Sequence, residues 1–350
     1  MAQILDGKIV RDKIANDLRS TISDLRSPPK LVIIQVGDNP ESNTYIRQKV
    51  LFGQKIGAIV DHQKLPEDTP QENLNSTIHN LNSDSSVNGI IVQLPIPPNL
   101  DKDKIINSID PKKDVDGQTA SNIKLLLEGT VSRHPGVATT TIGSSEPIIK
   151  TVDSIGPSGL QNDSKTSIGF TPATTRGIFT LLDYYKITVS GKHVVVVGRS
   201  SLVGKPTALL ALNKNATVTV CHSKTENLPA VTKTADILIV ATGKPKLITK
   251  DYVSENQVVI DVGINVIARS ETTKQSDEEI ASLSASGRIA RNDGEVKPES
   301  EPEKQKLVGD VDFESVSKIV SAISPVPGGI GPMTVASLFQ NLMEAYKRQI

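Results

Sequence analysis

Two residues suited to proton transfer, Tyr45 and Lys49, stand four positions apart in the segment NPESNTYIRQKVLFGQKIG. Asn39 is a good N-cap residue and Pro40 suits the first turn, so the segment predicts a helix over 40–56 with both side chains on one face. A lysine can accept a proton once burial disfavours its charged form. A tyrosine and a lysine at this spacing are equally typical of a packed ring beside a solvated ammonium, so a chemical role needs further support.

Polar side chains also follow a strand that is predicted to be fully buried. Gln93 comes directly after the apolar run GIIV and before Leu94 and Pro95. Ligands of open α/β sheets bind at the carboxyl ends of parallel strands, which is where this amide is expected. The segment DPKKDVDGQ then places Asp114 and Asp116 before a turn glycine. Paired aspartates at such a turn are often only turn chemistry, and this loop offers too few oxygen ligands for a metal.

The elements that would position these residues alternate between apolar runs of strand length and helical stretches. The first series predicts strands over 30–37, 58–65 and 89–95, with helices over 40–56 and 71–84. A second series predicts a helix over 171–185 and strands over 192–200, 216–222, 236–243 and 258–265. Such alternation indicates parallel strands with helical crossovers. We therefore predict an α/β protein of two domains with a cleft between them, the second a Rossmann-type doubly wound parallel sheet.

The run VVVVGRSSLVGKP has the layout in which backbone N–H groups at a helix start receive a phosphate. Gly198 and Gly204 are spaced more widely than in the compact GxGxxG pattern, so a plain α/β turn stays an alternative. NAD enzymes commonly place a carboxylate after the next strand to bind the ribose. Here no carboxylate stands at the tip of that strand, and the two strand ends instead offer hydroxyl and cationic groups suited to a 2′-phosphate. These groups, which favour NADP over NAD, are Arg199, Ser200, Ser223 and Lys224.

The segment SPVPGGIGPMTVASLFQNLMEAY (324–346) is a rigid Pro/Gly loop that leads into a helix. Its glycines allow the backbone to approach a flat ligand closely. The apolar residues of the helix recur at helical spacing, and they are Val335, Leu338, Leu342 and Tyr346.

Length and charge exclude several classes of function. The 350 residues suggest two domains, since a domain has about 100–200 residues. Lys+Arg and Asp+Glu both number 39, so the formal charge is zero and nothing favours a nucleic-acid or membrane partner. The sequence offers no membrane-spanning apolar run or signal peptide, and Cys221 is its only cysteine, which predicts a cytoplasmic protein without disulfides or a cysteine zinc site.

The motifs together resemble the bifunctional methylenetetrahydrofolate dehydrogenase/cyclohydrolase family. The resemblance rests on PESNTYIRQK, GIIVQLPIP, PKKDVDG, VVVVGRSSLVGKP, TVCHSKT, ATGKP, VIDVGIN, VGDV and PVPGGIGPMT, in that order. It implies oxidation of 5,10-methylenetetrahydrofolate with NADP as cofactor, hydrolysis of the methenyl product to 10-formyltetrahydrofolate, and no metal. It further implies a homodimer formed through the nucleotide domains. The place of such an enzyme is one-carbon metabolism, which supplies purine, methionine and histidine biosynthesis.

The resemblance also implies roles for individual residues. Lys49 is the candidate catalytic lysine and Gln93 its hydrogen-bond partner, while Tyr45 flanks the folate and Asp116 grips the edge of the pterin. Further substrate contacts are implied at Leu94, Pro95, Pro327, Gly328 and Gly329. Cofactor contacts are implied at Gly198, Arg199, Ser200, Val203, Gly204, His222, Ser223, Thr242, Gly243 and Ile264.

The implied domains are a folate-binding catalytic domain, 1–128 plus 325–350, and an NADP-binding Rossmann domain, 171–324. A connector over 129–170 and a polar tract over about 267–306 are longer than the usual links of the family, and the connector is expected to modulate closure of the cleft. Two other functions stay open: a dehydrogenase without cyclohydrolase activity, and a non-catalytic folate- or nucleotide-binding regulator. A Rossmann dehydrogenase of the shikimate type would leave the N-terminal motifs unexplained.

Overall fold

The computed structural model describes residues 2–129, 169–267 and 306–350. Contacts between Cα atoms divide the chain into two compact units. Unit 1 comprises Met1–Lys13 and Gly177–Thr334, and unit 2 comprises Ile14–Arg176 and Val335–Ile350. Three helices run across the boundary, namely α1 (Gly7–Ser23), α6 (Ala173–Tyr184) and α11 (Ile330–Gln349). Most of the predicted connector and polar tract, 130–168 and 268–305, lies outside the described residues.

Unit 2 is built on a parallel sheet of three strands in the order β3-β2-β4. They are β2 (Lys30–Val36), β3 (Ile59–Leu65) and β4 (Gly89–Val92). The strand β2 lies in the middle of this sheet, and six of its seven residues are buried. A near-continuous apolar run such as KLVIIQV is typical of a parallel strand covered on both faces.

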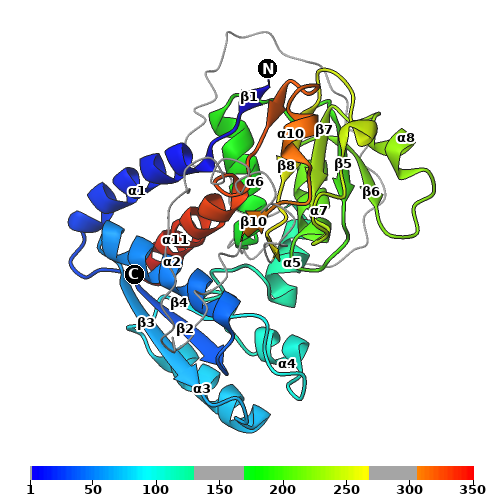
Figure 1. Ribbon diagram of the computed structural model, residues 1–350. Coiled ribbons are helices and arrows are strands. Elements are labelled where there is room, and N and C mark those ends of the chain that lie inside the picture. The colour runs from blue at the N-terminus through cyan, green and yellow to red at the C-terminus, as the bar shows by residue number, and fades with distance from the viewer. Residues whose placement is uncertain (1, 130–168, 268–305) are drawn as a thin grey trace, which may run out of the picture. The chain divides into compact units, whose positions relative to one another are not determined.

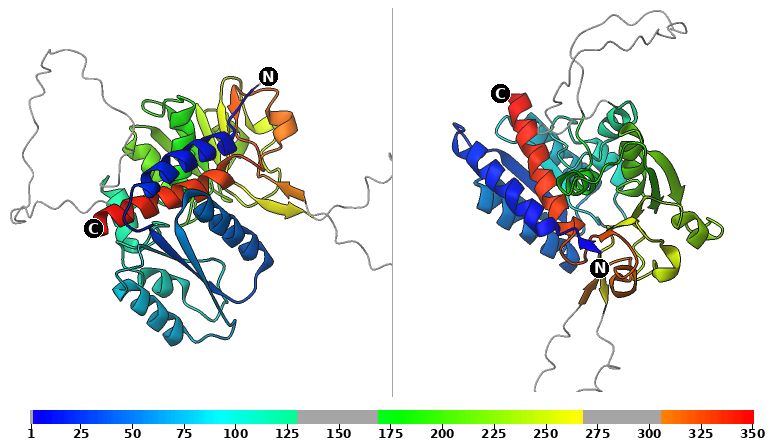
Figure 2. Two further views of the ribbon diagram at one scale, coloured as in Figure 1. Left: turned by 90° about the vertical axis from the view of Figure 1, so that its left-hand side faces the viewer. Right: turned by 90° about the horizontal axis from the view of Figure 1, so that it is seen from above.

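Helices cover both faces of this sheet. On one face lie α3 (Gln71–Ser83) and α4 (Lys102–Asn107), whose apolar residues join the core with those of β2 and β4. On the other face lie α2 (Pro40–Ile56) and α11, whose Phe52 and Phe339 rings are 5.2 Å apart. Figure 2 shows α2 and α3 on opposite sides of the strands. A short helix, α5 (Ala120–Leu127), follows the DVDG turn.

Unit 1 is built on a parallel sheet of six strands, with β5 to β8 side by side (Figure 1). In spatial order the strands are β1 (Gln3–Ile4), β11 (Ala322–Ile323), β8 (Val258–Asp261), β7 (Ile237–Val240), β5 (His193–Val197) and β6 (Thr217–Cys221). The crossovers contain α7 (Gly204–Asn213), α8 (Leu228–Thr232), the 3₁₀ helix η1 (Lys250–Tyr252) and α10 (Phe313–Val316). An antiparallel pair, β9 (Asn265–Ile267) and β10 (Lys306–Val308), completes the unit.

The N-terminal residues differ from the sequence prediction in the sheet that they join. Gln3 and Ile4 pair in parallel with Ala322 and Ile323, so the first strand belongs to the sheet of unit 1. The prediction had assigned 1–128 to the folate domain. A strand of two residues has no periodicity from which its partner could be recognised. The boundaries of the functional domains stay a prediction.

The predicted fold class is confirmed in its two α/β units and in the parallel sheets. The helix predicted over 40–56 begins and ends at these residues: the Asn39 side chain accepts from Ser42 N, Pro40 occupies the first turn, and Gly57 ends the helix with a φ of 84°. In α3, Leu74, Ile78 and Leu81 are buried, as their spacing predicts.

Candidate active site and cofactor site

Lys49 and Gln93 lie side by side in unit 2, as the sequence predicts. Lys49 projects from the middle of α2, and Gln93 directly follows β4, where its backbone N–H donates to Ile34 O. The Lys49 Nζ donates to Gln93 Oε1 over 2.8 Å. Gln93 Nε2 in turn donates to Leu94 O, also over 2.8 Å. Because the amide nitrogen already has this partner, the amide oxygen is held facing the lysine.

Asp116 lies in a loop whose backbone is fixed on both sides. Its carbonyl accepts from Ala173 N, and a Cβ added at Gly117 would come within 2.8 Å of Pro172 N. Asp114 is buried and accepts from Gln118 N, Thr119 N and Asn122 Nδ2. Asp114 therefore stabilises the turn, which is one of the alternatives that the sequence left open. The carboxylate of Asp116 instead interacts electrostatically with Lys49.

Burial disfavours the charged forms of both ionisable groups, and the attraction between the two charges partly opposes this effect. Burial lowers the pKa of the Lys49 ammonium, and the charge of Asp116 only partly opposes this shift. Burial likewise raises the pKa of the Asp116 carboxyl; Lys49 opposes that shift and Asp114 adds to it. Both side chains are half-buried, so they remain accessible to a ligand. A lysine held by a neutral amide at a half-buried position is suited to exchanging protons.

The remaining predicted substrate residues fall into two groups. Tyr45 lies half-buried on α2, one turn before Lys49. Leu94 and Pro95 follow Gln93 in the chain, and the peptide bond between these two residues is cis. The other group, Pro327, Gly328 and Gly329, lies in unit 1. There Gly7 N donates to Gly328 O, so this loop packs against the start of α1. The role of these three residues toward the substrate stays a prediction.

The predicted cofactor residues lie at the carboxyl ends of four adjacent strands of unit 1. They follow β5 (Gly198 to Gly204), β6 (His222, Ser223), β7 (Thr242, Gly243) and β8 (Ile264). This edge of a doubly wound parallel sheet is where dinucleotides bind.

Two glycines at this edge, Gly198 and Gly204, allow neighbouring backbone segments to approach more closely than a side chain would permit. A Cβ at Gly198 would lie 2.1 Å from Ala241 O, and one at Gly204 would lie 2.2 Å from Gly198 O. Ser200 Oγ accepts from the backbone N–H groups of Val203 and Gly204, both over 3.2 Å, just before and at the first residue of α7.

The residues of this edge fit NADP. A Cβ placed on Gly243 would meet no atom within 4 Å, so the backbone there borders open space. The four residues directly after β6, 222–225, include no carboxylate, and the Ser223 and Arg199 side chains at this edge are exposed. A hydroxyl and a guanidinium are suited to a 2′-phosphate.

Two buried aspartates that the sequence analysis assigned no role shape these loops. The Asp310 carboxylate accepts from Thr242 N, Thr242 Oγ1 and Gly243 N over 2.6–2.9 Å, and from Asn265 Nδ2 over 2.9 Å. Asp261 accepts from the backbone N–H groups of Gly263, Asp310 and Val311, all over 3.0 Å. Burial raises the pKa of Asp261 to about 7, against the effect of these donors. A signal was present in VIDVGIN and VGDV, where Asp261 lies two residues before a glycine and Asp310 directly follows one.

The described part of the chain contains neither a cluster of metal-ligating side chains nor a helix that could cross a membrane. Within residues 2–129, 169–267 and 306–350, no three His, Cys, Asp or Glu side chains gather as they would around a metal ion. None of the helices in these ranges combines the length and the hydropathy needed to span a bilayer.

Comparison with known proteins gives one family for both units. Residues 5–116 match the tetrahydrofolate dehydrogenase/cyclohydrolase catalytic domain, and residues 172–350 match its NAD(P)-binding domain. The chain is 38% identical to the bifunctional protein FolD of Lactobacillus acidophilus, over 100% of this chain and 99% of the relative. It is 40% identical to that of Agathobacter rectalis, over 99% of this chain and 100% of the relative.

Solved structures agree with these relatives. The bifunctional FolD enzyme of Campylobacter jejuni is 36% identical with a TM-score of 0.77, over 100% of both chains. The Trypanosoma brucei dehydrogenase-cyclohydrolase, complexed with NADP cofactor and inhibitor, is 28% identical with a TM-score of 0.76, over 99% of this chain and 98% of that one. With both family domains present and relatives aligned along almost its whole length, the chain belongs to the tetrahydrofolate dehydrogenase/cyclohydrolase family.

Proposed function

We propose that Lys49, Gln93 and Asp116 carry the substrate chemistry of this enzyme. The enzyme oxidises 5,10-methylenetetrahydrofolate to the 5,10-methenyl compound with NADP and hydrolyses that product to 10-formyltetrahydrofolate. The observation that carries the proposal is the 2.8 Å hydrogen bond from Lys49 Nζ to Gln93 Oε1, at a site where burial lowers the pKa of the amine.

In the oxidation, the protein's part is alignment. A hydride leaves the one-carbon bridge of the folate, and the two nitrogens beside that carbon stabilise the resulting cation. NADP, when bound, supplies the hydride acceptor. Asp116 fixes the folate by accepting from a ring N–H and the neighbouring exocyclic amine, a charge-assisted pair that also sets the orientation of the ring. Tyr45 contributes its ring as a flat wall for the folate.

In the hydrolysis, water attacks the cationic carbon and a protein group takes up a proton from it. The bond from that carbon to one of its two nitrogens then breaks as a proton is returned to the leaving nitrogen. A lysine with an unperturbed pKa of about 10.4 is neutral in only about one molecule in 2,500 at pH 7. Burial and the positive charge of the methenyl substrate both lower the pKa of Lys49 and so increase its neutral fraction. Gln93 orients the amine without adding a charge that would oppose this.

The preference for NADP is expected to depend on the exposed groups after β5 and β6. Ser223→Asp would place a negative charge beside the 2′-phosphate, and like charges brought together at an interface cost several kcal/mol. We expect the KM for NADP to rise by about tenfold or more, with the KM for NAD much less affected. Initial rates with each cofactor measure this.

The matched control for this variant is Thr217→Asp. Thr217 is also exposed on β6 but lies at the opposite end of the strand. An unchanged KM for NADP in Ser223→Asp, or an equal rise in Thr217→Asp, would place the 2′-phosphate elsewhere.

We also propose that the enzyme is a homodimer associating through unit 1. The strand β6 is an edge of the six-stranded sheet, and Val220 on β6 and Leu212 on α7 are 40% and 58% exposed. An exposed apolar edge strand favours pairing with another chain. Sedimentation equilibrium is expected to show a dimer that Val220→Lys dissociates and that Ile9→Lys, at another exposed apolar residue, leaves intact. A wild-type monomer, or a dimer that survives Val220→Lys, contradicts this interface.

A cytoplasmic location remains part of the proposal. It is supported by the single cysteine, Cys221, which is free and buried. Recovery of the native protein from a membrane or secreted fraction of its cells would contradict it.

A further inference from the structure

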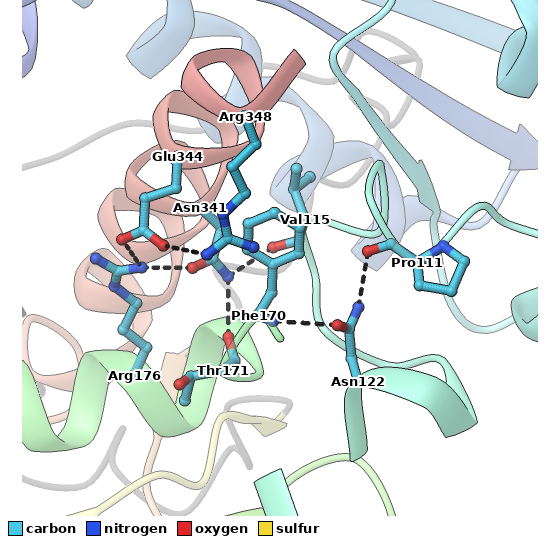
Figure 3. A network of polar contacts seen from close by, with 9 residues as sticks. All are labelled: Pro111, Val115, Asn122, Phe170, Thr171, Arg176, Asn341, Glu344 and Arg348. Atoms are coloured by element: carbon cyan, nitrogen blue, oxygen red, sulfur yellow. Dashed lines mark hydrogen bonds and ion pairs between the residues drawn. The ribbon is translucent and has the colours of Figure 1, made fainter. Parts of the chain in front are cut away.

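A buried asparagine on the C-terminal helix fastens the loop that carries Asp116. Asn341 is fully buried in the mostly apolar inner face of α11, where Ser337 is the other fully buried polar residue. Its Nδ2 donates to Val115 O over 2.8 Å and to Thr171 O over 2.9 Å. Its Oδ1 accepts from Arg176 NH1 over 2.6 Å (Figure 3). Both N–H groups of this amide are therefore used on backbone carbonyls.

The two carbonyls belong to two loop segments, the one that contains Asp116 and the one that bonds to it. Val115 directly precedes Asp116, and Thr171 lies two residues before Ala173, whose N–H donates to Asp116 O over 3.2 Å. A second amide, Asn122, joins the same segments by accepting from Phe170 N and donating to Pro111 O (Figure 3). The Asp116 loop thus has a backbone bond of its own to the 170–173 segment, and Asn341 holds both together.

Charged groups around Asn341 determine which way its amide faces. Arg176 NH1 lies 2.7 Å from Glu344 Oε1, and the Arg176 side chain is 7% exposed. Glu344 also pairs with Arg348, whose guanidinium lies 4.3 Å from the centre of the Phe170 ring. Because Arg176 can only donate, it fixes Oδ1 of Asn341 on its own side and leaves Nδ2 facing the carbonyls.

We propose that Asn341 is a positioning residue for the folate substrate, because it fixes the Val115–Asp116 peptide and thereby the place from which the Asp116 carboxylate meets the pterin. This inference rests on the proposed role of Asp116. A buried asparagine on an apolar helix face is otherwise a cost to folding, since hydrophobic residues of similar volume often replace buried polar networks without loss of stability. Its value lies in the geometry that it imposes on the loop.

The test compares Asn341→Leu, which keeps the volume and removes both donors, with Leu338→Ala on the same helix. Leu338 is 1% exposed and its side chain has no hydrogen-bonding group, so its truncation leaves a cavity in the core and lowers the thermal midpoint without removing a hydrogen bond to the loop. We expect Asn341→Leu to raise the KM for methylenetetrahydrofolate about tenfold with little change in the KM for NADP. Leu338→Ala is expected to lower stability and to leave both KM values near those of the wild type.

The double variant with Asp116→Ala separates this inference from the function on which it rests. If Asn341 acts through Asp116, Asn341→Leu adds nothing to the folate KM of Asp116→Ala. Full additivity, or a folate KM unchanged in Asn341→Leu while Asp116→Ala raises it, overturns the inference alone. An unchanged folate KM in Asp116→Ala overturns the proposed role of Asp116 itself.

A second variant keeps the test decisive if Asn341→Leu does not fold. Asn341→Asp retains the shape and the contact with Arg176, but it turns a carboxylate oxygen toward the Val115 and Thr171 carbonyls. It is expected to raise the folate KM in the same way, and a wild-type value in a folded Asn341→Asp protein would contradict the positioning role.

Discussion

Replacing Lys49 by alanine is expected to leave an enzyme that still reduces NADP but accumulates methenyltetrahydrofolate. Only the hydrolysis needs a group that accepts a proton from water, and the loss of such a group costs about 10²–10⁴-fold in rate. The Gln93 amide loses its 2.8 Å partner but has no proton to exchange in its place. Recording reduced nicotinamide and methenyltetrahydrofolate separately in one reaction measures both steps.

The matched control for this variant is Lys55→Ala. Lys55 lies on the same helix, more than one turn beyond Lys49, and its side chain is exposed. It is expected to behave as the wild type in both steps. Hydrolysis by Lys49→Ala at the wild-type rate would assign the proton transfer to another group, and wild-type accumulation of the intermediate would make the chain a dehydrogenase only.

Asp116→Ala is expected to weaken folate binding in both reactions and to leave NADP binding unchanged. Hydrogen bonds to a charged group contribute about 1.5–3 kcal/mol, which corresponds to a rise of about 10–100-fold in the KM for methylenetetrahydrofolate. The pair is lost from the ground state as well as the transition state, so the effect is expected mainly in KM. Initial-rate kinetics with each substrate varied in turn measure it.

The control for this variant removes an equal charge from the same unit. Asp103 lies on α4 with a side chain that is 86% exposed, and Asp103→Ala is expected to change neither KM. Thermal unfolding of both variants checks that the fold is kept. A rise in the NADP KM with an unchanged folate KM in Asp116→Ala would contradict the assignment.

Much of this site could be predicted because local chemistry and sheet geometry agree. Asn39, Pro40 and Gly57 define the ends of α2, and the helical period then places Tyr45 and Lys49 on one face. The contact between Lys49 and Gln93 joins residues 44 positions apart. Sheet geometry predicts only that Gln93 lies at the carboxyl end of a buried parallel strand, where ligands bind, and the contact with Lys49 is implied by the resemblance to the family.

The residues that sequence reasoning missed act over long separations and have no local pattern. Asp310 reaches Thr242 across 68 residues, and Asn341 reaches Val115 across 226. A single asparagine in an amphipathic helix gives no sign of the carbonyls that it meets, because those carbonyls come from backbone that only the tertiary fold brings near. The strand β1 was missed for the same reason, since two residues pair with a partner more than 300 positions away.

The most direct test of the account is the pH dependence of methenyltetrahydrofolate hydrolysis at saturating substrate. The neutral amine of Lys49 is the form that accepts the proton, and its fraction increases as the pH rises. Because burial lowers the pKa of Lys49, the rate should rise with pH and level off above an apparent pKa that is lower than the ordinary lysine value of about 10.4, and this rise should be absent from Lys49→Ala. A rate that falls with rising pH, or the same profile in wild type and Lys49→Ala, would contradict a proton-accepting Lys49.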